Sequence, residues 1–297
     1  MNLAPIAVQV TSSRDEHAHP VVRARNYAVD SGRYSIEVDP ADGARIVSFS
    51  LDGKNVLVTR EDSPEAYGSS FWPSPQSDWS WPPPLEIDKR PWHVSAKKNA
   101  LELESAVNPA LGLSVKQRIT LDGTRGVATI TYTLENHGSA PRKVAPWQNS
   151  RTRPGGLTFY ASDTPSTPES DLKLEPQKGV IWFLHDPSKF TKGVKSFSDG
   201  KGWLAHVDGD LLFVKVFPDL PPGAQAPKEA EIELYVDGAG RFVEVEQQGA
   251  YVELPPGGHS TWTVHWLVEQ LPASVEPSLG NAALVAHAQA MAARVQR

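Results

Sequence analysis

Short runs of alternating apolar and polar residues, separated by turn-forming residues, recur along most of this chain. Residues 34–38 read YSIEV before a turn at residues 39–43, and residues 127–134 alternate in the same way. A period of two places apolar side chains on one face of a strand, and turns at this spacing join antiparallel neighbours. The pattern predicts an all-β protein built from antiparallel sheets. Helical periodicity occurs only near the end, where four apolar residues share one helix face: Leu284, Ala288, Met291 and Val295.

The length of the chain is compatible with one large β domain. All-β sandwiches and barrels reach 297 residues as single domains. We expect an irregular N-terminal arm over residues 1–30, a single β domain over residues 31–272 and a short C-terminal helix within residues 273–297. Residues 165–200 are polar and rich in turn-forming residues, which predicts an excursion across the sheet with one apolar run at 180–184.

Composition argues against several classes of partner. The net charge of -6 is spread along the chain without a basic block, so we expect no nucleic-acid partner. No apolar run is long enough to span a membrane. The chain has no cysteine, no Gly-rich phosphate loop, no G-x-S-x-G motif and no H-E-x-x-H motif, so we expect no cofactor. His17 and His19 have no third ligand close by, and we expect no metal site.

The most unusual segment is residues 67–92, which read YGSSFWPSPQSDWSWPPPLEIDKRPW. It holds four tryptophans among six prolines. Proline lacks the N–H that a helix interior or a central strand requires, so we predict a long, stiff loop. Indole rings present apolar faces and N–H donors, which suits stacking on sugar rings. We therefore take Trp72, Trp79 and Trp81 as candidate sugar-binding residues, together with Gln76. The alternative is that the tryptophans pin the loop to the domain.

A late strand carries two acidic residues. In the run FVEVEQ, the period of two places Glu244 and Glu246 on one face and the two valines on the other. On the floor of a cleft, burial and like-charge repulsion would raise the pKa of at least one carboxyl group and produce a general base. Facing solvent, the two residues would be ordinary surface groups. Both readings are open at this point.

Further candidates are cationic or aromatic. Residues 143–149 predict a strand, followed by a polar, basic loop from Trp147 to Gly156 that carries Arg151. Its guanidinium could bind sugar hydroxyls or a carboxylate, or hold the Gly-Gly turn in place. Lys215 lies in the apolar run LLFVKVF and must reach a partner or a water-filled cleft. His206 and His265 lie in strands, where a structural role is commoner than that of a general acid.

Several segments resemble an uncharacterised bacterial family within the galactose mutarotase-like superfamily. They are YSIEVDPADGARIVSFSLDGKNVL, YGSSFWPSPQSDWSWPPP, APWQNSR, GWLAHVDGDLLFVKVF and FVEVEQQGAYVELPPGGHSTWTVHW. The resemblance implies a β-supersandwich whose concave face holds a carbohydrate. In the aldose 1-epimerases of this fold, a late-strand glutamate takes the anomeric proton and a histidine protonates the ring oxygen. By position, Glu246 matches that glutamate best and Glu244 second, whereas the H-P-Y-F type histidine segment has no counterpart.

The sequence therefore leads to two functional hypotheses. The first is a protein that binds a small-molecule carbohydrate in the cleft, with Trp147 adding a stacking wall and with epimerase-like catalysis by Glu246. The second is a non-catalytic carbohydrate-binding or protein-interaction module that uses the Trp/Pro-rich segment in a polyproline conformation. Residues 1–10 lack the pattern of a signal peptide, and the start resembles that of a trimmed mature chain, so we favour a periplasmic or secreted location. The sequence does not indicate an oligomeric state.

Overall fold

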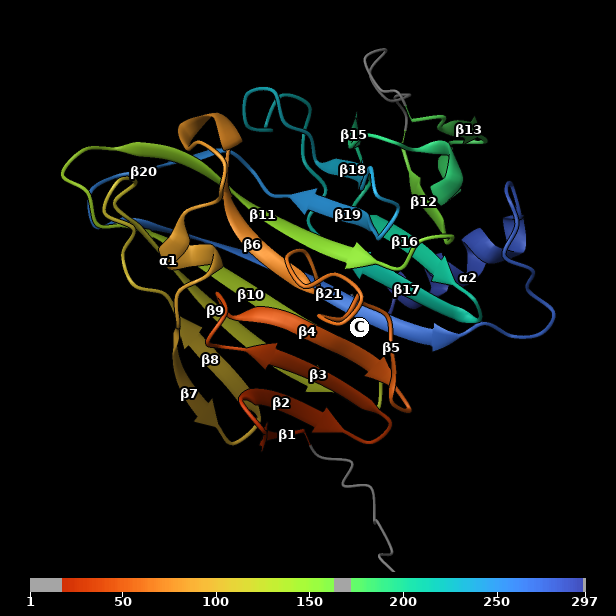
Figure 1. Cartoon of the computed structure of the whole chain (residues 1–297), viewed down its shortest axis with the longest axis horizontal. Helices are drawn as coiled ribbons and strands as arrows, with labels where there is room; N and C mark the ends of the chain where they lie inside the picture. The colour runs from red at the N-terminus through yellow and green to blue at the C-terminus, as the bar shows by residue number, and fades with distance from the viewer. Residues whose placement is uncertain (1–17, 163–171, 296–297) are drawn as a thin grey trace, which may run out of the picture.

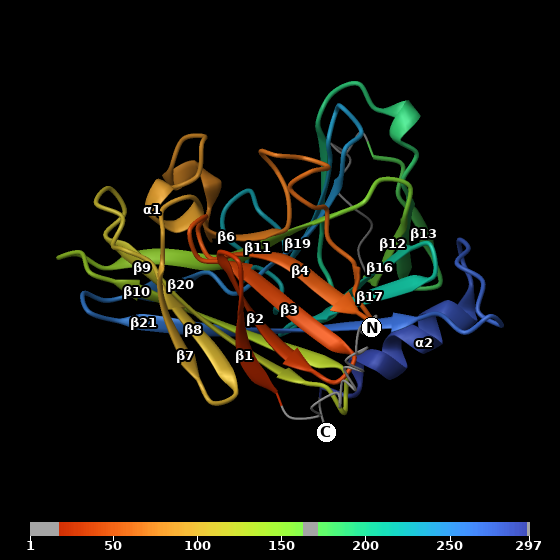
Figure 2. The same cartoon turned by 60° about the horizontal axis from the view of Figure 1, so that its bottom comes forward.

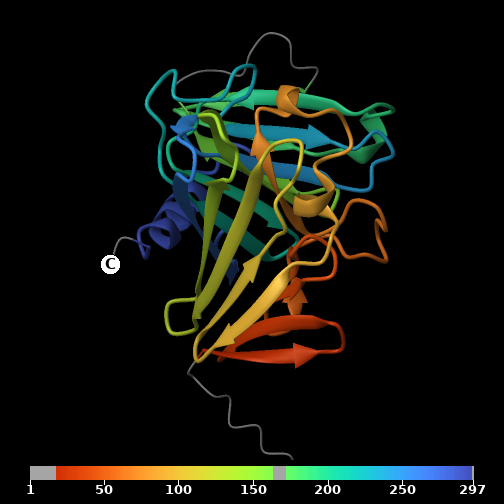
Figure 3. The same ribbon diagram turned by 90° about the vertical axis from the view of Figure 1, so that its left-hand side faces the viewer.

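Two large antiparallel sheets stack face to face, and a C-terminal helix covers the outer face of one of them (Figures 1 and 3). The structure is a computed structural model that describes residues 18–162 and 172–295. Every strand pairing between neighbours is antiparallel. The predicted all-β architecture with a short C-terminal helix is confirmed.

The first sheet has eleven strands and carries most of the N-terminal third of the chain. Its main path runs, in spatial order, β1 (His19–Arg23), β2 (Asn26–Ser31), β3 (Tyr34–Asp39), β4 (Arg45–Leu51), β6 (Ser69–Ser74), β11 (Arg142–Thr152), β19 (Val243–Gln248), β18 (Ile232–Val236) and β15 (Val194–Ser198). Two short strands join its side: β5 (Lys54–Asn55) pairs with β4, and β20 (Val252–Leu254) pairs with β11.

The second sheet has ten strands and holds the middle of the chain and its last long strand. In spatial order these are β13 (Glu175–Gln177), β14 (Val180–Leu184), β12 (Leu157–Ala161), β16 (Trp203–Asp208), β17 (Leu211–Val216), β21 (His259–Gln270), β10 (Val127–Asn136), β9 (Leu113–Asp122), β8 (Ala100–Glu104) and β7 (His93–Lys97). In β10 the apolar residues are buried and the intervening threonines are half-exposed, as the alternation predicts.

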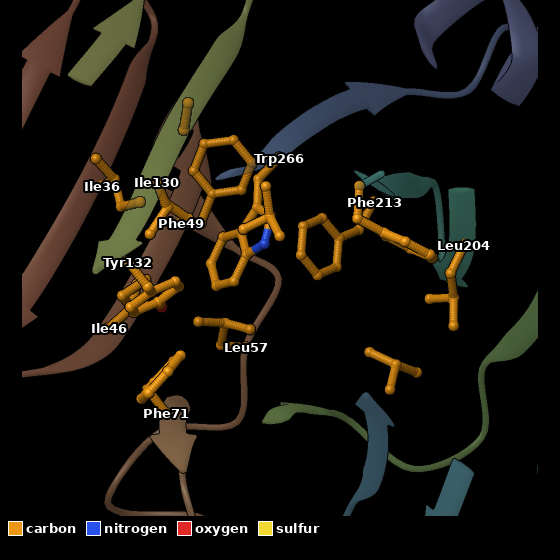
Figure 4. Packing of buried hydrophobic residues seen from close by; sticks show 14 of the residues in the cluster. Ile36, Ile46, Phe49, Leu57, Phe71, Ile130, Tyr132, Leu204, Phe213 and Trp266 are labelled. Atoms are coloured by element: carbon orange, nitrogen blue, oxygen red, sulfur yellow. The ribbon is translucent and has the colours of Figure 1, made fainter. Parts of the chain in front are cut away.

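The main hydrophobic core lies between the two sheets (Figure 4). Phe49 of the first sheet lies with its ring centroid 6.0 Å from Phe213 and 5.8 Å from Trp266 of the second sheet. Phe71 stacks on Tyr132 with a centroid separation of 4.4 Å. Each such aromatic pair adds about 1 kcal/mol beyond the burial of its apolar area. The core therefore fixes how the first sheet sits on the second.

The helix α2 (Ala282–Ala292) forms a third layer on the far face of the second sheet (Figure 2). Asn281 caps its first turn by accepting hydrogen bonds from two backbone N–H groups. Leu284, Ala288 and Met291 are buried in a second apolar cluster with residues of the sheet. The predicted apolar face of the helix is thus the one that packs. Within the two described ranges, no helix has the length and apolar character needed to cross a membrane.

Two segments expected to be irregular contain strands. Strands β1 and β2 occupy residues 19–31, where the sequence suggested an irregular arm; residues 1–17, including His17, lie outside the described residues. In the Trp/Pro-rich segment, residues 69–74 form the buried central strand β6, so the prediction of a loop is wrong there. Only the remainder is loop, interrupted by a short 3₁₀ turn at Gln76–Asp78 and by the one-turn helix α1 (Leu85–Asp88).

Proline is tolerated in β6 because of how it pairs with β11. Pro73 lies directly opposite Pro146 in the register of the two strands. The carbonyl oxygen of Pro73 accepts from the Trp79 indole, and that of Pro146 accepts from Gly249 N–H, so both point away from the shared ladder. The two prolines therefore form a non-hydrogen-bonded pair, in which no N–H is required between the strands. Neither proline therefore removes a hydrogen bond from the ladder between β6 and β11.

Other boundaries also differ from expectation. The polar residues 148–152 belong to β11 and are buried, although the sequence predicted a loop. Within residues 165–200, β14 coincides with the apolar run at 180–184, but β13 and β15 also form. Strand β15 is the edge of the first sheet, because Val194–Ser198 pairs with β18. This pairing places a polar stretch one strand away from the acidic strand β19, with β18 between them.

Candidate functional site

A hollow of about 540 Å³ lies on the face of the first sheet that points away from the core, the face turned toward the viewer in Figure 1. Its floor comes from β4, β6, β11, β19, β18 and β15, and the loop between β6 and β7 forms one side. Besides short apolar residues, its lining includes Arg45, Glu65, Trp72, Gln76, Trp81, Asp88, Lys89, Trp147, Arg151, Lys195, Tyr235, Asp237, Arg241, Phe242 and Glu244.

One row of side chains crosses the floor in register. Arg151 on β11 lies opposite Glu244 on β19, which lies opposite Tyr235 on β18, which in turn lies opposite Lys195 on β15. The Nε atom of Arg151 is 2.9 Å from Oε1 of Glu244, and both side chains are largely buried. Burial lowers the pKa of Arg151, and the carboxylate of Glu244 opposes that shift. The row therefore presents an ion pair, a phenol and an ammonium group to the hollow.

Beside this row, two residues along the strands on the same sheet face, lies an acidic pair that a single lysine bridges. Glu246 and Glu233 are directly opposite each other on β19 and β18, and neither is exposed to solvent. Lys195 Nζ lies 3.6 Å from Glu246 Oε2 and also forms an ion pair with Glu233. Like charges placed opposite each other across two strands are destabilising, so the lysine and a shared proton compensate for them.

The pKa values in this cluster follow from burial and from the shared lysine. Burial raises the pKa of Glu246 to about 7, while the ammonium group of Lys195 lowers it. Burial also raises the pKa of Glu233 well above its ordinary value. Burial alone would lower the pKa of Lys195, but the two carboxylates raise it. The lysine thus stays charged, and the acidic pair takes up a proton close to neutral pH.

The tryptophans contribute to the hollow in unequal ways. Trp72 and Trp147 line it with their rings 5.1 Å apart and edge-on, but only 4% and 1% of their surfaces are exposed. Trp81 stands edge-on to Trp72 at 6.0 Å and is 68% exposed. Trp79 does not line the hollow; its indole donates to the Pro73 carbonyl oxygen. Of the expected stacking walls, only Trp81 offers a largely free ring face.

The loop between β6 and β7 is fixed to the sheet through Asp88. Its Oδ1 atom accepts a 2.8 Å hydrogen bond from the indole of Trp72 and a 3.3 Å hydrogen bond from Arg45. Trp92 donates its indole N–H to the carbonyl oxygens of Glu86 and Ile87 at the end of the loop. Trp92 therefore has the pinning role that the sequence left open, while Trp72 both pins the loop and lines the hollow.

Several residues selected from the sequence lie elsewhere. Glu246 is on the same face of β19 as Glu244 but does not line the hollow, and its Oε2 accepts a 2.6 Å hydrogen bond from the Trp147 indole. Lys215 is fully buried between the two sheets, where it donates to Ser150 Oγ and to the Val245 carbonyl oxygen, each at 2.8 Å. It faces the core because β17 belongs to the second sheet.

The two strand histidines are also outside the hollow. His206 is buried and hydrogen-bonds the Thr158 hydroxyl group, and burial lowers its pKa to about 3. His265 is half-buried on β21 beside Thr129, and burial lowers its pKa. Gln76 and Glu244, in contrast, line the hollow together with Arg151.

Sequence reasoning missed Arg45, Asp88, Glu233 and Lys195. Glu233 alternates with Ile232 and Leu234 in the same way that Glu244 alternates with its valines, so the same period-of-two signal could have selected it. Lys195 gave no such signal, because its strand lies in a polar stretch. Its role depends on β15 pairing with β18, which is distant in sequence. Among the described residues, no three or more His, Asp or Glu side chains are grouped to hold a metal ion.

The comparisons with known proteins concern structure only. A scan against protein-family models finds no match, and a search of curated proteins finds none either. Solved structures match at low sequence identity. A galactose mutarotase-like protein from Clostridium acetobutylicum is 11% identical with a TM-score of 0.56, and the match covers 86% of this chain and 99% of that one.

Two further structures give the same result. A galactose mutarotase related enzyme from Lactobacillus acidophilus is 7% identical with a TM-score of 0.58, covering 86% of this chain and all of the other (100%). A candidate aldose 1-epimerase from Escherichia coli K12 is 14% identical with a TM-score of 0.56, covering 83% of this chain and 99% of that one. The two stacked antiparallel sheets of this chain are therefore the galactose mutarotase-like fold.

Proposed function

We propose that the hollow on the first sheet binds a carbohydrate. The observation that carries this proposal is that the exposed ring of Trp81 and the charged row from Arg151 to Lys195 line one hollow. An aromatic face suits the apolar face of a sugar ring, and the alternating donors and acceptors of the row suit its hydroxyl groups. The structural neighbours named for mutarotases and epimerases support the same class of ligand.

Unpartnered polar atoms near the floor add support. The side-chain amide of Asn149 is fully buried, and neither its oxygen nor its nitrogen has a hydrogen-bond partner among the described residues. By the period of two, Asn149 is on the same strand face as Trp147 and Arg151. The Oε1 atom of Glu246 is also buried without such a partner. Buried polar groups of this kind require an explanation, and because neither residue lines the hollow, ordered water between them and a ligand would supply the missing donors and acceptors.

A finer proposal is that the bound sugar undergoes epimerase-like proton transfer. Glu244 is the carboxylate of the row that crosses the floor, and Lys195 is a cation on the same row. Glu246 lies beside them with a pKa near neutrality, which suits a group that exchanges a proton through its neighbours. Glu244 is therefore the candidate base that touches the ligand, and Glu246 is the candidate reservoir for its proton. No histidine is among the described residues that line the hollow.

Binding is tested by isothermal titration over a panel of neutral and acidic sugars, with tryptophan fluorescence as a second signal. We expect heat for at least one sugar, and at least a tenfold loss of affinity in Glu244→Gln. Glu102→Gln, an exposed glutamate of β8 on the second sheet, is the matched control and retains the wild-type affinity. Heats that stay flat across the panel, with unchanged fluorescence, would remove the carbohydrate proposal.

Catalysis is tested separately by following anomer exchange of the bound sugar by NMR. We expect exchange in the wild type and a large loss in both Glu244→Gln and Glu246→Gln. Equal exchange rates in the wild type and the two variants would leave a binding protein without the epimerase-like activity.

A further inference from the structure

We propose that the ligand of the hollow is an oligosaccharide of at least two rings rather than a monosaccharide. This inference rests on the proposed function and concerns the length of the sugar. A hexose has about twelve heavy atoms, and even at the volume of a whole water molecule for each, about 30 Å³, it fills about 360 Å³. The hollow measures about 540 Å³. The hollow therefore has about 180 Å³ more than one ring fills, which gives room for part of a second ring.

The width of the floor leads to the same conclusion. Trp72 on β6 and Tyr235 on β18 both line the hollow, and three strand-to-strand steps separate these two strands. At about 4.8 Å a step, the floor is roughly 14 Å wide. Glu244, which is buried, and Lys195, whose side chain is 25% exposed, lie toward the β18 and β15 side. Trp81 stands on the opposite side, next to Trp72.

The rim beside Trp81 is built as a platform for a ring outside the deep part of the site. Trp81 is 68% exposed, and Pro82 beside it is also exposed and lines the hollow. Because this exposed ring lines the hollow beside the buried ring of Trp72, it offers an apolar face that a sugar ring can cover. Exposed polar side chains that could bind the hydroxyl groups of a second ring line the same hollow: Gln76, Glu65 and Lys89.

The loop that carries Trp81 is held in place before any ligand binds. Pro83, Pro84, Ile87 and Asp88 are buried, and Asp88 accepts from the Trp72 indole. A platform that is already fixed loses little conformational entropy on binding. This favours the stacking of a sugar ring of the oligosaccharide against it. The deep row from Arg151 to Lys195 would then select one ring, and Trp81 would hold the next ring outward.

The test uses a glycan array that displays monosaccharides together with oligosaccharides of increasing length, followed by titration of the best-bound glycan and its shortened forms. We expect the affinity of the wild-type chain to rise at least tenfold from one ring to two or three. Trp81→Ala should lose most of that gain, so that longer chains bind the variant little more tightly than a single ring does. Leu85→Ala is the control, since Leu85 is 45% exposed on the same loop but does not line the hollow.

The outcomes separate the two proposals. If single rings bind as tightly as longer chains, the oligosaccharide inference is overturned while carbohydrate binding stands. The same holds if Trp81→Ala weakens single-ring binding as much as binding of longer chains. If no glycan of any length binds, the proposed function fails, and the exposed ring of Trp81 must be explained by another class of partner.

Discussion

Trp147 donates its indole N–H to Glu246 Oε2 across 2.6 Å, which joins the aromatic lining of the hollow to the acidic pair beside it. The same carboxylate oxygen lies 3.6 Å from Lys195 Nζ, and that ammonium group lies 4.5 Å from the centre of the Trp147 ring. The three side chains come from β11, β19 and β15, which are distant in sequence. A change in the charge of Glu246 therefore affects two residues that line the hollow, Trp147 and Lys195.

The first prediction concerns the dependence of stability on pH. The pKa of Glu246 is about 7 in the folded chain, against an ordinary value of 4.5, so between these pH values the folded state binds more protons than the unfolded state. The free energy of unfolding of the wild type should therefore fall as pH rises from about 4.5 to 7, by about 3 kcal/mol from this group. Glu246→Gln should remove that part of the slope in urea denaturation, whereas Glu102→Gln should follow the wild type. Parallel curves for all three proteins would contradict the prediction.

The sequence predicted what depends on local pattern. Alternation located most strands, including β10, and helical spacing located the buried face of α2. Strand β6 was missed because the rule against proline in central strands considers one strand without its neighbour. The rule therefore does not say whether the position of the proline is hydrogen-bonded in the sheet. Pro73 escapes the rule only because Pro146 lies opposite it in a non-hydrogen-bonded pair, and that pairing involves two segments far apart in the chain.

The order of strands in the sheets, which the sequence pattern does not give, also decides where Lys215 and Lys195 lie. The run LLFVKVF shows that Lys215 needs a partner, but it cannot show on which side of the strand the partner lies. The structure places that partner in the core, on Ser150 and Val245 of the other sheet. Lys195 reaches the hollow only because β15 pairs with β18 at the sheet edge. Which cation joins a site depends on long-range strand order, whereas the shared face of Glu244 and Glu246 follows from the period of two alone.

The second prediction concerns Lys215. Burial lowers its pKa well below the ordinary value of 10.5, so the unfolded state binds a proton that the folded state binds less tightly. The free energy of unfolding of the wild type should therefore rise as the pH increases toward the ordinary pKa of lysine, and Lys215→Met should lose this rise. Because the lysine lies between the sheets, sugar affinity in the variant should stay within twofold of the wild type. Denaturation at a series of pH values checks the predicted stability, and titration with sugar checks the predicted affinity. A tenfold loss of affinity in Lys215→Met would show that Lys215 contributes to sugar binding.

The third prediction concerns the buried pair of Arg151 and Glu244. Removing one partner leaves the other charge uncompensated, so Arg151→Met should lower the free energy of unfolding by about 3 to 5 kcal/mol. Adding Glu244→Gln should restore part of this loss, with a coupling energy of about 1 to 3 kcal/mol in a double-mutant cycle. Chemical denaturation of the four proteins at neutral pH gives the coupling. Strict additivity would mean that the 2.9 Å ion pair contributes nothing to stability.

The last prediction concerns Gly43, on which the position of the loop between β6 and β7 depends. Its φ of +67° is in the left-handed region, and a Cβ atom there would lie 2.2 Å from the carbonyl oxygen of Asp88. Gly53 is the matched control, because its φ is +80° and an added Cβ would meet nothing within 4 Å. Gly53→Ala should cost only the strain of a non-glycine residue in this region, about 1 to 2 kcal/mol. Gly43→Ala carries the same strain and must also displace the backbone at Asp88.

This displacement reaches the hollow, since Asp88 accepts hydrogen bonds from both the Trp72 indole and Arg45. We therefore expect Gly43→Ala to lower the free energy of unfolding by at least 2 kcal/mol more than Gly53→Ala does. It should also reduce sugar affinity in conditions where the chain is fully folded, whereas Gly53→Ala should leave the affinity unchanged. Thermal denaturation and titration of both variants measure the two effects. Equal destabilisation with unchanged affinity in both would show that the loop can shift at Asp88 without disturbing Trp72.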